Sequence, residues 1–74
     1  APAADAYLRA LLEHNAVQAE SAVVQSEQSE DMLVDTINEA LFDLVGDTLI
    51  EFSAAGPQII EDYEADVRGY LDHE

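Results

Sequence analysis

The sequence predicts a small α+β domain that is mostly helical, with three helices followed by a β-hairpin and a C-terminal helix. Three observations lead to this fold class. Apolar residues recur at helical spacing from Tyr7 to Val45 and again after Glu61. A short segment rich in β-forming residues, 48–60, lies between these regions and contains a Gly-Pro pair. Hydrophobic residues make up 49% of the 74 residues, which is too many for a disordered acidic chain.

The first helix is predicted to begin after Pro2, with Asp5 as its N-cap, and to continue to about His14. Its apolar stripe consists of Tyr7, Leu8, Leu11 and Leu12. Asn15 is expected to end this helix because asparagine favours turns and caps.

A second helical stretch is predicted over 16–26. Its apolar residues are Val17, Ala19, Ala22, Val23 and Val24. The following letters, SEQSE, contain no apolar residue, so we expect a break there, with Ser26 or Ser29 capping the next helix. A single long helix over 17–45 is the alternative.

Residues 29–46 form the central predicted helix, which Gly46 ends as a C′ glycine. Its expected core face consists of Leu33, Ile37, Ala40, Leu41 and Leu44. Its opposite face carries Asp31, Asp35, Glu39 and Asp43, which repeat every four residues. No lysine or arginine lies among these acids, and each like-charged pair costs about 0.2–0.5 kcal/mol. The acidic face is therefore the strongest functional signal in the chain.

Two short strands, 48–52 and 58–60, are predicted to form a hairpin around the loop 53–57. A last amphipathic helix is expected over 61–73, with Tyr63, Val67, Tyr70 and Leu71 on its apolar side. Three helices followed by a two-stranded wing is the layout of a winged-helix domain. The central helix would take the position of a DNA-reading helix, but its acidic face cannot approach DNA.

The charge restricts the classes of function. The chain has 17 acidic residues against 2 arginines and no lysine, for a net charge of −15. Such a surface repels nucleic acid and anionic membranes, and it leaves divalent cations, basic protein surfaces or plain solubility. No apolar run approaches the roughly 20 residues of a membrane span, and no secretory signal is recognisable. We therefore expect a cytoplasmic protein.

Catalysis is not expected, because the chain has no spacing of nucleophile and base, no Gly-rich phosphate loop and no HExxH motif. The length of 74 residues leaves room for one small domain, residues 1–74. The absence of an initiator methionine suggests that it is a piece of a longer protein, and a tag scar is the alternative.

The segment 33–63 resembles the TerB-C family, the C-terminal domain found beside TerB domains in bacterial tellurite-resistance-associated proteins. The matching letters are INEA with FD following, then GD-x-LIE, and more loosely IEDY. The resemblance implies a non-enzymatic accessory domain, the C-terminal module of a larger bacterial stress-response protein, that binds metal through acidic residues. Carried over by position, these residues are Glu39, Asp43, Asp47 and Glu51.

The spacing of the acids is compatible with a metal site but does not establish one. Carboxylates four residues apart on a helix can both reach one hard cation such as Ca²⁺ or Mg²⁺. The candidate ligands from the spacing are Asp35, Glu39, Asp43 and Asp47, and Glu51 is added by the resemblance alone. The alternatives are a solvated acidic face and a docking face for a basic protein surface or another domain of the same parent protein.

Two large apolar residues interrupt the acidic face. On a helical wheel Phe42 lies about 20° from Asp35, and Met32 lies about 60° from it on the other side. We expect the hairpin or the last helix to cover Phe42. Alternatively, Met32 and Phe42 form a protein-binding patch for a basic partner or for a second copy in a homodimer. The histidines, His14 and His73, are expected at the surface.

Overall fold

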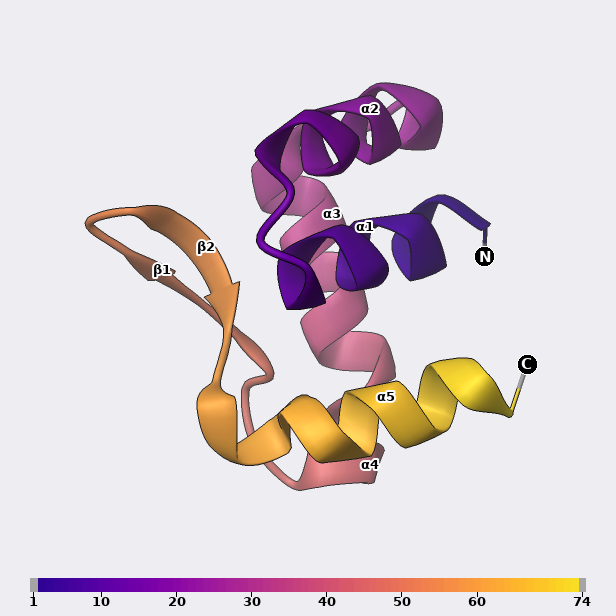
Figure 1. Ribbon diagram of the computed structural model, residues 1–74, viewed down its shortest axis with the longest axis vertical. Helices are drawn as coiled ribbons and strands as arrows, with labels where there is room; N and C mark the ends of the chain where they lie inside the picture. Colours follow the sequence, from indigo (N-terminus) through magenta and orange to yellow (C-terminus); the bar gives the residue numbers. More distant parts are fainter. Residues whose placement is uncertain (1, 74) are drawn as a thin grey trace.

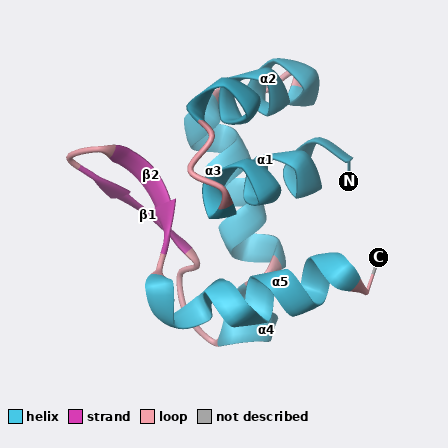
Figure 2. Ribbon diagram, in the orientation of Figure 1, coloured by secondary structure: helices cyan, strands magenta, loops and turns pink. Residues whose placement is uncertain are grey.

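The chain has the predicted order of helices, a β-hairpin and a C-terminal helix, with an additional short helix, α4, before the hairpin. The computed structural model describes residues 2–73. Its elements are α1 (Pro2–Leu12), α2 (Ala16–Ser26), α3 (Glu30–Ala40), α4 (Phe42–Val45), β1 (Ile50–Ser53), β2 (Gly56–Ile59), the 3₁₀ turn η1 (Glu61–Tyr63) and α5 (Glu64–Asp72). Helices α1 and α2 form a helical hairpin, α3 passes behind them, and α5 crosses the lower end of α3 (Figure 1). The β-hairpin stands to one side of this helical body (Figure 2). The predicted fold class is therefore confirmed.

Helix α1 ends at Leu12, earlier than predicted, because the chain turns sharply after it. His14 adopts the left-handed conformation, with φ 54°. The N–H groups of His14 and Asn15 then donate to the carbonyls of Leu11 (3.2 Å) and Ala10 (2.9 Å). This is the Schellman pattern, with a histidine in the position that usually holds glycine.

The predicted break between the second and third helices is confirmed, and side chains cap both helices. The Asn15 side chain accepts a hydrogen bond from the N–H of Gln18 (3.1 Å) and begins α2. Helix α2 ends at Glu27, with φ 60°. Ser29, one of the two predicted caps, accepts from the N–H of Met32 (3.2 Å) and begins α3.

One prediction for the N-terminal half is wrong. Asp5 is not an N-cap, because α1 already includes Pro2 and places Asp5 within its first turn. Val17 and Val24 lie on the outer side of α2 with 75% and 73% of their surface exposed. Helix α2 instead packs through the small residues Ala19 and Ala22. Because these side chains are small, α1 and α2 can approach each other closely.

The predicted central helix, 29–46, is two helices. At Leu41 the backbone leaves the helical region (φ −102°, ψ 6°), and a single turn, α4, follows. The prediction for Gly46 is confirmed, since it has φ 72° and its N–H donates to the carbonyl of Phe42 (2.6 Å).

This break changes the buried stripe. Leu33, Ile37 and Leu41 are buried as predicted. Ala40 and Leu44 are exposed instead, Leu44 by 44%, and Val34 is buried beside Leu33. The helical wheel for a continuous helix no longer applies after Leu41, because α4 is a separate turn.

The hairpin is tighter than predicted. Ile50 pairs with Ile59, and Phe52 pairs with Pro57, so Pro57 belongs to a strand rather than to the loop. Between the strands only two residues form the turn, and Gly56 follows them with φ 108°. A type I turn followed by a glycine of positive φ is a common way to close such a hairpin.

One polar side chain holds the hairpin to the helices. The Oδ1 atom of Asn38 on α3 accepts from the N–H groups of Leu49 (3.1 Å) and Ile50 (2.8 Å), and its Nδ2 donates to the carbonyl of Ile50 (3.1 Å). The base of the hairpin is thereby fixed against α3.

The core lies where α1, α3, α5 and the base of the hairpin meet. Its largest fully buried side chains are Tyr7, Leu8, Val34, Ile37, Leu49, Ile50 and Val67. No helix within residues 2–73 has both the length and the apolar character needed to traverse a lipid bilayer.

Candidate functional site

Helix α4 presents two large apolar side chains to solvent. Phe42 is 53% exposed and Leu44 is 44% exposed. The prediction that the hairpin or the last helix covers Phe42 is therefore wrong. Exposed acids, Glu39 and Asp43, precede and follow Phe42 along the chain. We call the set of exposed residues Glu39, Phe42, Asp43 and Leu44 the α4 face. Helix α4 lies at the lower end of α3 (Figure 1).

Met32 is exposed as well, by 58%, but it lies on a different element. It belongs to the first turn of α3, whereas Phe42 begins α4 on the other side of the break at Leu41. The two residues predicted as one interaction patch are therefore both accessible, and they belong to opposite ends of the α3–α4 segment.

The five predicted metal ligands are distributed over four parts of the chain. Asp35 and Glu39 keep their spacing of four on α3. Asp43 lies on α4 beyond the break, Asp47 lies in the following loop, and Glu51 lies on β1. Among residues 2–73, no three histidine, aspartate or glutamate side chains gather into a group that could hold a metal ion.

Two of these carboxylates already have protein partners. Asp47 accepts from the N–H of Thr48 (2.7 Å) and from the hydroxyl of Tyr63 (2.8 Å). The hydrogen bond to Asp47 raises the pKa of the Tyr63 phenol, because ionised tyrosine would lose the donor and meet a like charge. Glu51 accepts from the side-chain amide of Gln58 (3.3 Å) on the neighbouring strand. Asp47 therefore joins the loop before β1 to η1, and Glu51 links the two strands of the hairpin.

A further acid, which the sequence did not single out, is held by a buried tyrosine. The Tyr7 side chain is fully buried, and its hydroxyl donates to Oε2 of Glu30 (2.9 Å). Burial, followed by the hydrogen bond and the charge of Glu30, raises the pKa of Tyr7. The carboxylate of Glu30 is thus fixed at the start of α3. The two histidines are exposed, as predicted.

These features define a small, strongly acidic α+β domain whose exposed apolar groups lie among carboxylates. The TerB-C domain model matches residues 1–68 of this chain. The chain therefore belongs to the TerB-C domain family, as the resemblance indicated. Membership supports its description as an accessory domain of TerB-type, tellurite-resistance-associated proteins. Comparison with curated proteins and with solved structures finds no match.

Proposed function

We propose that this domain is a non-catalytic interaction domain whose α4 face docks on a basic protein surface in a bacterial stress-response protein of the cytoplasm. The exposure of Phe42 is the single observation that carries the proposal. An ion site has no use for an exposed aromatic ring, whereas aromatic side chains are among the residues that supply much of the binding free energy at protein interfaces.

The charge of the chain gives the chemistry of the partner. With a net charge of −15, the domain repels acidic surfaces and accelerates encounter with basic ones. Burial of the exposed half of the Phe42 side chain in a partner pocket would contribute about 0.8–1.6 kcal/mol. The neighbouring carboxylates, Glu39 and Asp43, would orient the basic partner. Another domain of the parent protein is the first candidate partner, and a second copy of this chain is the next.

The experiment is a titration of the labelled domain with the separately produced TerB domain of its parent protein, followed by NMR. Shift changes centred on α4, and their loss in Phe42→Ala, are expected. Val24→Ala is the control, because Val24 is 73% exposed but lies on the outer side of α2. If the two variants behave alike, or if the shifts avoid α4, the proposal is wrong.

Divalent-cation binding is the second candidate, favoured by the pair Asp35 and Glu39, which α3 keeps at a spacing of four. Ca²⁺ or Mg²⁺ would complete its shell largely with water. Thermal melts with Ca²⁺, Mg²⁺ and Mn²⁺ test this, with Asp35→Asn/Glu39→Gln as the variant. A site requires that the cations stabilise the wild type more than the variant. If the metal-free variant gains as much stability as the wild type gains from metal, the effect is relief of charge repulsion.

A further inference from the structure

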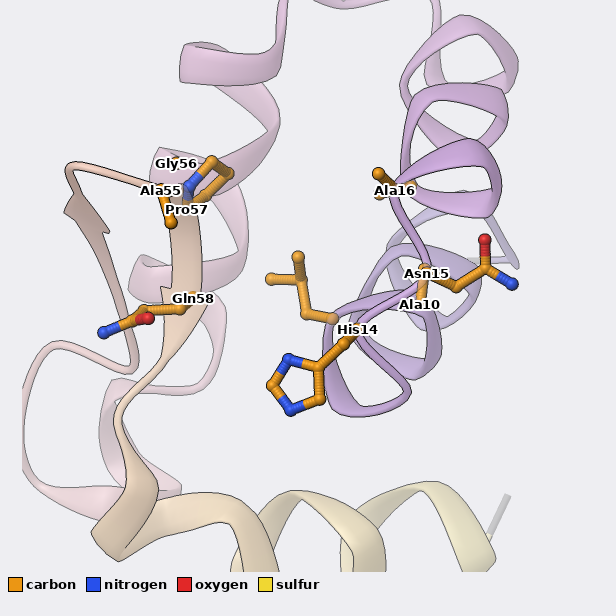
Figure 3. Close-up of a pocket in the computed structure, with 10 residues that line it drawn as sticks. Ala10, His14, Asn15, Ala16, Ala55, Gly56, Pro57 and Gln58 are labelled. Atoms are coloured by element: carbon orange, nitrogen blue, oxygen red, sulfur yellow. The ribbon is translucent and has the colours of Figure 1, made fainter.

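A groove runs between β2 and the α1–α2 helical hairpin. It consists of three adjoining hollows of about 350, 200 and 380 Å³, all of which include Leu11 in their lining. The hollows of about 350 and 200 Å³ are called the upper hollows. Ala16 and Ala19 line one wall of both, and Ala55 and Pro57 line the other wall. Figure 3 shows this gap, with Pro57 on the strand side and Ala16 on the helix side. We call it the β2 groove.

The apolar face of the hairpin continues beyond the core into this region. Ile50 and Ile59 pair at the base of the hairpin and are buried. Two residues further along the strands, Phe52 and Pro57 pair on the same face, because side chains alternate with a period of two. Phe52 is 54% exposed and Pro57 is partly exposed. The tip of the hairpin therefore has an apolar face without a covering element among residues 2–73.

Carboxylates stand at both ends of the β2 groove. Glu20 and Glu30 line the hollow at the hairpin tip, and Glu61 and Glu64 line the hollow at the base of β2. Glu30 is the best positioned of these, because Tyr7 holds its Oε2 atom and leaves Oε1 for a ligand. The two arginines of the chain both line a different hollow, between α1 and α5. The groove is thus mainly apolar in its middle, where His14, Asn15 and Gln58 supply the polar part of the lining, and it carries acids at its ends.

The backbone of β2 indicates how an occupant would bind. The N–H of Ile60 donates to the carbonyl of Leu49 (3.0 Å), so alternation places the pair Phe52 and Pro57 at a position without ladder hydrogen bonds. The backbone groups of Pro57 then face outward, and proline has no N–H to donate. Simple addition of a third strand would lack a donor at the middle of this edge. Side-chain docking is therefore favoured over strand addition.

We propose that the β2 groove binds an extended basic segment of a partner protein, with a small apolar side chain between Leu11 and Pro57 and arginine or lysine side chains toward the acids at the two ends. This proposal concerns a surface separate from the α4 face, since neither Phe42 nor Leu44 lines the groove. Charge complementarity selects the occupant, because the acids at both ends and the net charge disfavour a second copy of this chain.

A fluorescent synthetic peptide of about eight residues, with two arginines at each end and leucine and alanine in the middle, is the probe. At about 3.3 Å per residue, it spans the four residues of β2 and both acidic ends. Binding is measured by anisotropy at low salt, and NMR shifts are expected at Leu11, Ala16 and Gln58. A peptide with glutamates in place of the arginines should bind at least tenfold more weakly.

Ala55→Arg is the test variant, because Ala55 is exposed and lines both upper hollows. Ala54→Arg is the matched control, which adds the same charge at the neighbouring turn residue outside the groove lining. We expect Ala55→Arg to weaken peptide binding about tenfold and Ala54→Arg to weaken it less than about twofold. Circular dichroism verifies that both variants are folded.

Several outcomes would overturn the proposal. One is that Ala55→Arg and Ala54→Arg weaken peptide binding equally, and another is that the NMR shifts lie outside the groove. The others are that the glutamate peptide binds as tightly as the arginine peptide, and that the arginine peptide does not bind at low salt. Self-association that Ala55→Arg abolishes would identify a second copy of the chain as the occupant instead. If Ala55→Arg does not fold, two double variants give the same comparison. Glu20→Gln/Glu61→Gln removes exposed acids that line the groove, and Glu27→Gln/Glu39→Gln removes exposed acids outside it.

Discussion

The side-chain amide of Asn38 bonds both backbone polar groups of Ile50, as the edge of a third strand would. Ile50 lies opposite Ile59, a position at which the backbone groups point away from the partner strand. Asn38 satisfies the N–H at 2.8 Å and the carbonyl at 3.1 Å. Since Ile50 is 1% exposed, water cannot easily replace these bonds. The join between α3 and the hairpin therefore depends on one amide.

Asn38→Ala should destabilise the domain by about 2–4 kcal/mol, because it leaves buried backbone groups of Leu49 and Ile50 without partners. Urea unfolding followed by circular dichroism measures this loss. The control is Thr36→Ala, an exposed position on the same helix, which should change stability by less than about 0.5 kcal/mol. Equal effects of the two substitutions would contradict the structural role given to Asn38.

The hydrogen bond from Tyr7 to Glu30 predicts a loss of stability in alkali. The pKa of Tyr7 in the folded state is raised above its unfolded value near 10. The unfolded chain then releases this proton at lower pH, so the stabilisation is complete below about pH 10 and is lost as pH rises above it.

Tyr7→Phe should remove much of that alkaline decline and cost about 1 kcal/mol near neutral pH, where the hydrogen bond is intact. Urea titrations at a series of pH values compare the slopes. Tyr63→Phe is the control, because the pKa of Tyr63 is also raised but its hydroxyl bond to Asp47 lies at the surface. An alkaline slope unchanged by Tyr7→Phe would refute the assignment.

The two glycines Gly46 and Gly69 should respond to alanine with opposite signs. A Cβ atom would meet nothing within 4 Å at either position, so the backbone decides the result. Gly46→Ala should cost about 1–2 kcal/mol, because φ is +72° there. Gly69→Ala should stabilise α5 by up to about 1 kcal/mol. Thermal melts compare both variants with the wild type, and shifts of the same sign would contradict the prediction.

Sodium chloride should raise the melting temperature. The molecule measures 29 × 27 × 21 Å, and the Debye length falls from about 30 Å at 0.01 M salt to about 8 Å at 0.15 M. Repulsion among the acids acts across the whole domain at low salt and is screened at the higher concentration. Asp35→Asn/Glu39→Gln should be less sensitive to salt. A melting temperature that falls or stays constant would show that repulsion is not a major term.

Local signals allowed most of the secondary structure to be predicted. The second helix has the predicted bounds of 16–26. Ser29 caps the start of α3 as predicted, and Gly46 follows the last turn of α4 as predicted. Caps and helical periodicity depend on residues within one or two turns, which explains this agreement. The break at Leu41 was not predictable, because the apolar pattern continues through it and the turn is set by packing.

The candidate surfaces were less predictable than the elements. Phe42 looked like a residue in need of cover, and the structure leaves it 53% exposed because α4 is a separate turn. In the sequence Asn38 was only one residue of the INEA motif. Its hydrogen-bond partners, Leu49 and Ile50, lie 11 and 12 residues further along the chain. Its position at the border of the apolar stripe was the available signal.

The sequence by itself determined the family, the order of elements and the acidic character of the domain, since composition and short-range spacing encode them. The tertiary structure alone decided that Phe42 faces solvent, that Glu30 is held by Tyr7, and that β2 stands opposite α1 and α2 to form a groove. These relationships join residues distant in the chain, and only the packing of the core brings them together.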